Sequence, residues 1–184
     1  DAHAKGLKIV MDMVYNHIGL NHWLFSNLPM KNWVHPSDTF IQTTYRLTSI
    51  MDPHASQFDR NKMSNGWFVK HMPDLDQKNP FVAKYLIQNS IWWIETAGID
   101  GFRMDTYAYS DLGFMSALVK AIKKEYPNFS VVGEVWDHAV SFQAALTQNS
   151  NIKGAPETAL PGVTDFQLYF AINDALNKPM DWTG

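Results

Sequence analysis

Residues 99–135 read IDGFRMDTYAYSDLGFMSALVKAIKKEYPNFSVVGEV, and the order of patterns in this stretch decides the fold. Residues 99–104 form a short apolar run of strand length. Residues 111–126 have helical periodicity, and Pro127 ends that helix. Residues 129–135 form a second apolar run, so the stretch predicts a strand, a helix and a second strand. The predicted helix places one apolar face toward the core, made of Leu112, Met115, Leu118, Val119 and Ile122.

The same alternation continues outward in both directions. Repeated strand–helix units with continuous apolar strands indicate a parallel sheet covered by helices. The pattern fits either a doubly wound sheet or part of a (β/α)8 barrel. The outer elements that we expect are the end of a helix at residues 1–5 with Gly6 as its stop, a strand at 7–14, a helix from Asn79 and Pro80 to Gly98, a helix at 139–147, and a fourth strand at 163–168 followed by a helix at 169–176.

Residues 18–79 interrupt this alternation. The segment is too long for an ordinary loop, and its Trp, Phe and Met content favours an ordered insertion. We therefore expect residues 1–17 and 80–184 in the α/β unit and residues 18–79 in a small inserted domain. A complete barrel takes about 250 residues, so the chain is expected to be a piece of a longer protein. A part of a barrel exposes sheet edges and helix faces, so we expect this piece to oligomerise or to belong to a longer chain.

Composition narrows the class of protein. The chain has 184 residues, 46% of them hydrophobic, and a formal net charge of −3. This charge gives no basic surface for phosphates, which argues against a nucleic-acid partner. Because there is no cysteine, disulfides and thiolate metal sites are excluded. No stretch has the roughly 18 apolar residues of a membrane helix, and the location stays open between an extracytoplasmic and a cytoplasmic parent protein.

Ionisable side chains follow the predicted strands at the point where each strand ends. The carboxyl ends of parallel strands meet at one edge, where functional groups gather. Burying an unpaired carboxylate is costly, so acids in these positions indicate a site. The residues at the four expected strand ends are Asp12, Asn16 and His17, then Arg103 and Asp105, then Glu134 and Trp136, and finally Asp165.

Asp105 and Glu134 are the pair from which chemistry is predicted. They end adjacent strands, and neighbouring strands lie about 4.8 Å apart. Two such carboxyls can approach to about 5 to 5.5 Å, which suits a retaining rather than an inverting glycosidase. Arg103 lies on the same side of its strand as Asp105, and its fixed charge would keep Asp105 ionised as a nucleophile. Glu134 would carry the proton for the leaving oxygen. From the spacing alone, a structural ion pair remains an alternative.

Four segments together carry a resemblance to a known family. They are DMVYNH at 12–17, MPDLD at 72–76, GFRMD at 101–105 and GEVW at 133–136. In this order and spacing they resemble the signature segments of the α-amylase family, over essentially the whole chain. The resemblance implies a TIM barrel, in which this chain spans about the third to the sixth strand. It also implies a small domain after the third strand and retaining hydrolysis of α-glucans such as starch oligosaccharides, pullulan or cyclodextrins.

The resemblance also implies roles for single residues. Asp105 matches the nucleophile, Glu134 the acid/base and Arg103 the partner of the nucleophile. The matches on the substrate side are His17 as a ligand of a sugar hydroxyl, Asp12 as an acid that supports the site, and Trp136 as an aromatic on the leaving-group side, with packing as the alternative for Trp136.

A calcium ion is a further implication of the resemblance. Many members bind calcium between the inserted domain and the barrel through residues that match Asn16, Asp74 and the backbone carbonyl of Tyr109. Side-chain and carbonyl oxygens are the ligands that calcium requires. A hydrogen-bonded junction without metal is the alternative. Tyr109 also departs from the family pattern, where His is frequent, and this concerns specificity rather than catalysis.

Competing functions remain at this stage. A glucosyltransferase or isomerase can use the same covalent intermediate. A non-catalytic glucan-binding relative would lack the acids. A nucleotide-binding domain would need a Gly-rich phosphate loop directly after a strand, and none of the predicted strands is followed by such a loop. The family's third acid has no match before Gly184, so we expect no useful hydrolysis by residues 1–184 alone. The other histidines show no metal-binding spacing: His3, His22, His35, His54, His71 and His138.

Overall fold

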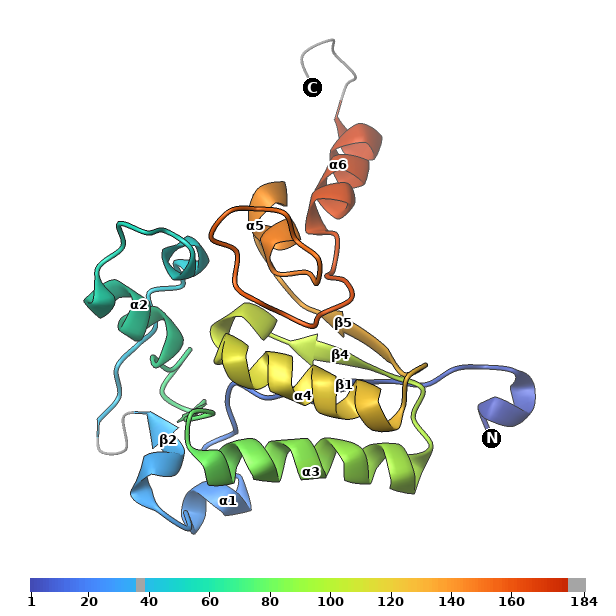
Figure 1. Cartoon of the computed structure of the whole chain (residues 1–184), viewed down its shortest axis with the longest axis horizontal. Helices are drawn as coiled ribbons and strands as arrows, with labels where there is room; N and C mark the ends of the chain where they lie inside the picture. The colour runs from blue at the N-terminus through green and yellow to red at the C-terminus, as the bar shows by residue number, and fades with distance from the viewer. Residues whose placement is uncertain (36–38, 179–184) are drawn as a thin grey trace.

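The fold is built on a small parallel sheet, seen in a computed structural model that describes residues 1–35 and 39–178. Its strands are β1 (Val10–Val14), β4 (Gly101–Asp105) and β5 (Ser130–Gly133), in the order β1-β4-β5. All neighbours are parallel. The strands run toward the inserted segment at the left of Figure 1. The expected parallel α/β architecture is confirmed, with strands shorter than the apolar runs.

Two helices cover one side of this sheet (Figure 1). Helix α3 (Pro80–Ala97) follows Asn79, whose side chain accepts a hydrogen bond from the backbone of Phe81, and it ends at Gly98 in the left-handed conformation. Helix α4 (Leu112–Glu125) begins after Asp111, which caps the amide of Phe114. Both caps satisfy amides that the first turn of a helix leaves free. The expected ends of both helices are therefore confirmed.

The core lies between the sheet and the two helices. Helix α4 buries the apolar face that its periodicity predicts, with Met115, Leu118, Val119 and Ile122 fully enclosed. Helix α3 buries Val82, Leu86 and Ile94 but leaves Phe81 and Trp92 exposed. Tyr15 enters the same core, where its hydroxyl pairs with that of Ser90 at 2.9 Å. A buried hydroxyl needs such a partner, and this pair fixes the end of β1 against α3.

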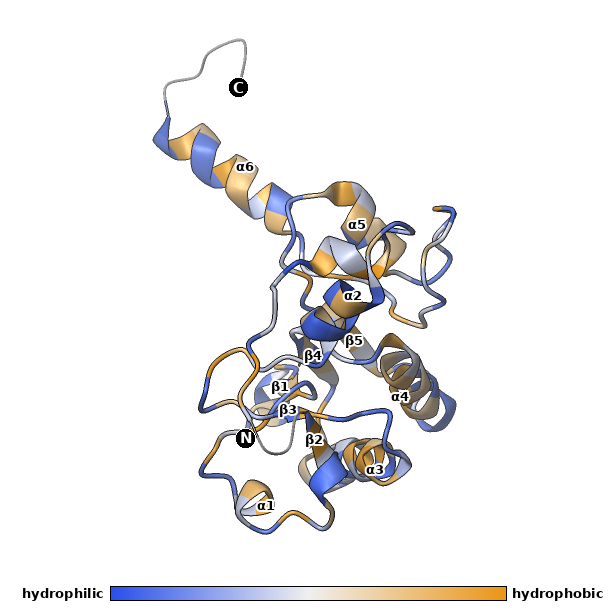
Figure 2. Cartoon of the chain, turned by 90° about the vertical axis from the view of Figure 1, so that its left-hand side faces the viewer, coloured by the Kyte–Doolittle hydropathy of each residue, from blue (hydrophilic) through white to orange (hydrophobic). Residues whose placement is uncertain are grey.

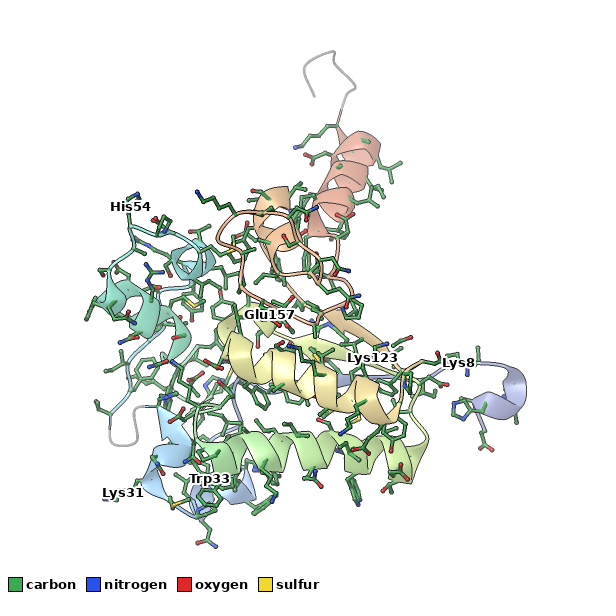
Figure 3. The ribbon with its side chains drawn as sticks, in the orientation of Figure 1. Lys8, Lys31, Trp33, His54, Lys123 and Glu157 are labelled. Atoms are coloured by element: carbon green, nitrogen blue, oxygen red, sulfur yellow. The ribbon has the colours of Figure 1, made fainter. Side chains whose placement is uncertain are left out.

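The inserted segment has its own small elements. Strands β2 (Val34–His35) and β3 (Asp74–Leu75) pair in an antiparallel manner. Figure 3 labels Trp33 beside α3, where its ring packs on Tyr85 with centroids 5.9 Å apart. The remaining elements are η1 (His3–Lys5) before β1, and α1 (Trp23–Ser26), η2 (Lys31–Trp33), η3 (Leu47–Ile50) and α2 (Gln57–Ser64) within the insertion. Whether residues 18–79 form a separate domain stays a prediction, and residues 36–38 and 179–184 of the expected ranges lie outside the described residues.

The predicted fourth strand at 163–168 is wrong beyond its first residue. Val163 makes one parallel bridge with Gly133 at the free edge of β5. Helix α6 (Phe166–Asn177) then begins three residues earlier than expected, because the side chain of Asp165 accepts a hydrogen bond from the amide of Leu168 and caps the helix. Asp165 is therefore a capping residue and not a strand-end acid. Helix α5 (Val140–Ala145) lies within the range predicted for it.

Helix α6 extends away from the rest of the molecule (Figures 1 and 2). Figure 2 shows apolar and polar residues mixed along it, and Leu168, Tyr169, Ile172 and Leu176 are exposed. Within residues 1–35 and 39–178, no helix combines the length and apolar character that crossing a membrane requires.

Candidate active site

The carboxyl ends of β1, β4 and β5 bring the predicted ionisable residues to one edge. The pairing places Asp12 of β1 beside Arg103 of β4, and Val14 beside Asp105. Glu134 follows β5 directly, and its amide donates a hydrogen bond to the carbonyl of Met104 at 2.8 Å. The strand register alone therefore sets these side chains next to each other, as expected for parallel strands.

Arg103 is the centre of the cluster. Its Nη1 lies 2.7 Å from both oxygens of Asp12 and 3.0 Å from Oδ1 of Asp105. Its Nη2 lies 2.6 Å from Oε1 of Glu134. Burial opposes the charge of Arg103, but these bonds outweigh burial and raise the pKa of the guanidinium. A planar group with five N–H donors can serve several carboxylates at once.

Asp105 and Glu134 therefore lie on the two sides of one guanidinium group. The contacts place their side chains on the same face of the sheet, which the predicted glycosidase pair requires. The expected contact between Arg103 and Asp105 is present, and Arg103 has further partners. It also binds Glu134 and Asp12, since the flat guanidinium reaches across three adjacent strand ends.

The other oxygen of Glu134 is held by the chain that follows β4. Glu134 Oε2 accepts a hydrogen bond from the amide of Thr106 at 3.0 Å. Thr106 adopts a left-handed conformation with φ of 44°, which is uncommon for a residue other than glycine and strained for a β-branched one. Tyr107 then packs over Gly133, where a Cβ would lie 3.0 Å from its ring. The glycine of GEVW thus permits the turn that orients Glu134.

His17 lies at the end of β1 beside this cluster. Burial lowers the pKa of His17, and the charge of Asp105 partly opposes the change. The neutral ring is therefore favoured near neutral pH, and a neutral imidazole can donate one hydrogen bond and accept another. Its Nδ1 is buried with no hydrogen-bond partner among the described residues. A polar group left in this state indicates that the site receives a polar ligand or water.

A cavity of about 200 Å³ opens beside Glu134. Tyr109 and Trp136, both expected near the substrate, line it. Burial, with smaller effects of nearby negative groups, raises the pKa of Tyr109 to about 12, so its phenol stays protonated and can donate a hydrogen bond. Trp136 stacks on Phe166 of α6 with centroids 5.0 Å apart, and 61% of the residue is exposed. Its exposed area leaves room for a ligand.

Asn16 and Asp74, the expected calcium ligands, do come together. Asn16 Nδ2 donates to Asp74 Oδ1 at 2.9 Å, and His35 Nδ1 lies 3.0 Å from Asp74 Oδ2. Burial raises the pKa of Asp74 to about 7, and His35 opposes the rise. Gln77 connects the carbonyl of Asn16 to the amide of Asp111, which follows Tyr109 and Ser110.

One oxygen of this arrangement would suit a calcium ion, because Asn16 Oδ1 is buried with no hydrogen-bond partner among the described residues. Both oxygens of Asp74 are engaged by donors, and Asn16 turns its amide N–H rather than its oxygen toward the carboxylate. Calcium requires six to eight oxygen ligands, about 2.3 to 2.6 Å away. Within residues 1–35 and 39–178, no group of three or more His, Cys, Asp or Glu side chains is placed to hold a metal. The contacts of Asp74 suit the hydrogen-bonded junction, whereas the unpaired oxygen of Asn16 suits a cation, so the calcium site stays a prediction.

Sequence patterns did not reveal several residues of the site. Phe68 and Leu47 come from the insertion and line the cavity. Thr106 holds Glu134 through its backbone, which no side-chain pattern can indicate. Gln77 and His35 lie at the junction described above. Gln77 directly follows MPDLD, and that position was the only available signal for it.

A family model and a solved structure each match most of this chain. The family model described as "Alpha amylase, catalytic domain" matches residues 1–155. The α-amylase of Geobacillus thermoleovorans, solved with acarbose, is similar with a TM-score of 0.70 and 31% identity, over 94% of this chain and 33% of that chain.

Curated relatives with similar sequences are also amylase-type enzymes. A cyclomaltodextrinase of Geobacillus thermopakistaniensis is 29% identical over 145 residues, which are 75% of this chain and 22% of the relative. An intracellular maltogenic amylase of Bacillus subtilis is 30% identical over 137 residues, or 74% of this chain and 22% of the relative. The chain thus spans less than a quarter of the length of these relatives.

Proposed function

This chain belongs to the α-amylase family, and we propose that the protein containing it hydrolyses α-1,4-linked glucans with retention of anomeric configuration. The substrate class includes starch oligosaccharides, pullulan and cyclodextrins. One observation carries the proposal. Asp105 and Glu134 end adjacent parallel strands and contact the two arms of the same guanidinium. Two carboxyls at such close range suit a retaining glycosidase.

In the first step, Asp105 attacks the anomeric carbon of the sugar. A bond forms between a carboxylate oxygen of Asp105 and this carbon, while the bond from the carbon to the glycosidic oxygen breaks. Glu134 gives its proton to the departing oxygen, and the leaving sugar becomes a free hydroxyl. Arg103 stabilises the negative charge of Asp105 before attack, since it donates a hydrogen bond to Oδ1 at 3.0 Å.

In the second step, water replaces the leaving sugar. Glu134 takes a proton from the water, the water oxygen bonds to the anomeric carbon, and Asp105 is released. Two displacements at the same carbon restore the starting configuration. The proposal requires Glu134 to exchange its contact with Arg103 for the glycosidic oxygen when a glucan binds. No step uses a metal.

Glucosyl transfer is the second candidate, because a sugar hydroxyl can take the place of water. The cavity beside Glu134 favours transfer, because an acceptor sugar bound in this cavity could react with the covalent intermediate on Asp105. Product analysis with maltotriose separates the two, since transfer gives products longer than the substrate and hydrolysis gives only shorter ones.

The test uses the full-length protein in which this sequence occurs. With maltotriose, proton NMR of the first product should show the α-anomer. Asp105→Asn and Glu134→Gln should each lower kcat by about a thousandfold or more, because a nucleophile or a proton donor is lost. With α-maltosyl fluoride, whose leaving group needs no proton, Glu134→Gln should retain much of its kcat/KM, which reports the first step, and Asp105→Asn should not.

Matched controls come from acids outside the cluster. Glu157, labelled in Figure 3, contacts Lys120 at 2.9 Å on the surface, so Glu157→Gln should leave kcat unchanged. Asp52→Asn serves the same purpose for Asp105, since the side chain of Asp52 accepts a hydrogen bond from the amide of His54 within the inserted segment. A β-anomer as first product, or full activity of Asp105→Asn, contradicts the proposal.

A further inference from the structure

The cavity beside Glu134 has walls from three separate parts of the chain. Leu47 and Phe68 come from the inserted segment, and Tyr109 belongs to η4 (Tyr107–Tyr109) after β4. Glu134 and Trp136 come from the end of β5. Figure 1 shows the inserted segment, which carries α2, beside the ends of the strands. At about 200 Å³ the cavity is smaller than the roughly 300 to 1,000 Å³ of pockets for drug-sized ligands, and it suits one sugar ring.

Phe68 lies at the meeting point of these walls. Its ring packs edge-on against Tyr109 with centroids 4.7 Å apart and against His17 with centroids 5.3 Å apart. The ring of Tyr45 lies on it at 5.7 Å. Phe68 thus touches one residue that ends β1 and one that follows β4, although it belongs to neither strand. It is only partly buried, so part of its apolar surface remains open to the cavity.

The backbone around Phe68 is held by several contacts within the inserted segment. Trp67 pairs with Gln42 in a β-bridge, and the carbonyl of Phe68 accepts hydrogen bonds from Gln42 Nε2 and from the hydroxyl of Tyr45. Gly66 lies so close to Thr43 that a Cβ would come within 2.5 Å of its backbone. Tyr45 itself has a φ of 57°, which a side-chain-bearing residue adopts only where the surroundings enforce it. A ring fixed in this way loses little conformational entropy when a ligand binds.

The position of the cavity relative to the reacting pair indicates which sugar it receives. Glu134 lines the cavity, whereas Asp105 does not. In the proposed reaction Glu134 protonates the oxygen that departs, so the sugar next to Glu134 and away from Asp105 is the leaving one. Trp136 lines the same cavity, and its indole offers a second aromatic surface to this sugar.

We propose that Phe68 is a specificity-determining residue that binds the leaving-group sugar against its ring. This inference rests on the proposed function, because it uses the assignment of Glu134 as proton donor. Apolar faces of sugar rings pack on aromatic side chains, and such contacts bury area that water otherwise covers. Phe68 therefore contributes to catalysis only when the leaving group is a sugar, and it acts through binding rather than through chemistry.

The experiment compares two leaving groups in the full-length protein. Maltotriose has a sugar as leaving group, whereas α-maltosyl fluoride has only fluoride. Phe68→Ala should lower kcat/KM for maltotriose about tenfold, the loss expected for one aromatic contact. The kcat/KM for α-maltosyl fluoride should stay within about twofold of the unmodified protein. Phe68→Leu keeps an apolar side chain but has no flat ring, and it should show the same split.

Controls separate this role from packing. Phe58→Ala changes an exposed phenylalanine of α2 that does not line this cavity, and it should alter neither substrate. The thermal midpoint of each variant shows whether that variant folds. If Phe68→Ala does not fold, the comparison of the two substrates is made with Phe68→Leu instead. Equal losses for both substrates, or an unchanged kcat/KM of Phe68→Leu for maltotriose, would overturn the inference. If the unmodified protein converts neither substrate, the proposed function itself fails instead.

Discussion

At the scale of single residues, Arg103 organises the site. Its guanidinium contacts Asp12 of β1, Asp105 at the end of β4 and Glu134 directly after β5. Three carboxylates this close would repel one another without a shared cation. The side chain of Arg103 is also partly buried, which strengthens these contacts relative to a surface ion pair. The arrangement therefore depends on the shape of guanidinium and not only on its charge.

Replacing Arg103 by lysine tests this dependence. An ammonium group has the same charge but cannot reach three carboxylates in a plane, so Asp105 and Glu134 should shift relative to each other. We expect kcat/KM of Arg103→Lys on maltotriose to fall by about a hundredfold or more, because a small misplacement of reacting groups has an effect of this size. Steady-state kinetics of the full-length protein measure it.

Arg60→Lys is the matched control, since Arg60 donates to the backbone carbonyl of Ala55 in the inserted segment, away from the carboxylate cluster. Its kcat/KM should not change. Retention of full activity by Arg103→Lys would show that charge alone is sufficient.

At the scale of elements, the opposite end of the sheet is fastened by Asp100. Its Oδ2 accepts a hydrogen bond from the amide of Ile9 at 2.8 Å and contacts His3, and its Oδ1 contacts Lys8 at 2.8 Å. Figure 3 labels Lys8 at this end of the sheet. Asp100 thus joins the segment before β4 to the segment before β1 and supports their register. The contact with Lys8, followed by those with Ile9 and His3, holds the pKa of Asp100 well below its ordinary value of 3.8.

The stability that Asp100 contributes should depend on pH. Because the pKa is lowered in the folded state, the stabilisation is present above the unfolded value of 3.8 and is lost as the pH falls below it toward the folded value. Asp100→Asn should therefore have a lower thermal midpoint than the unmodified protein at pH 7, and the difference should shrink below pH 3.8. Calorimetry from pH 2.5 to 7 measures this; a difference that grows on acidification would contradict the assignment.

At the scale of the whole molecule, the sheet has an open edge. β1 is one of the two outer strands of the sheet. Apolar residues of β1 and of the segment before it are exposed, together with apolar residues of α6. An exposed edge strand with apolar side chains can pair with another chain. In a (β/α)8 barrel every strand has a neighbour on both sides. The side chains at this edge are Leu7, Ile9, Val10 and Val14.

The 184-residue chain by itself should self-associate through this edge. Sedimentation velocity should show a mass that rises with protein concentration. Val10→Lys and Val14→Lys together should reduce the association, because charges on an edge strand oppose pairing. Val140→Lys, which changes an exposed valine of α5, should have no such effect. A monomer at every concentration would argue against association through β1.

The sequence by itself predicted the parallel α/β fold and the place of Asp105 and Glu134 at neighbouring strand ends. Apolar periodicity, Asn79 and Asp111 as caps, and Gly98 as a stop are local signals, and each acts within a few residues of the chain. Asp105 and Glu134 could be located because strand ends follow directly from the same periodicity. The prediction of a fourth strand at 163–168 was wrong for an equally local reason. Asp165 caps helix α6, so the chain is helical from Phe166 onward.

Only the tertiary structure decided which distant residues meet at the site. The shared use of Arg103, the turn at Thr106, the His35 contact of Asp74 and the place of Phe68 join residues far apart in sequence. Their contacts depend on strand register and on how the inserted segment packs beside the ends of the strands (Figure 1). No periodic pattern within the chain records such a contact, because its energy arises between elements rather than along one of them.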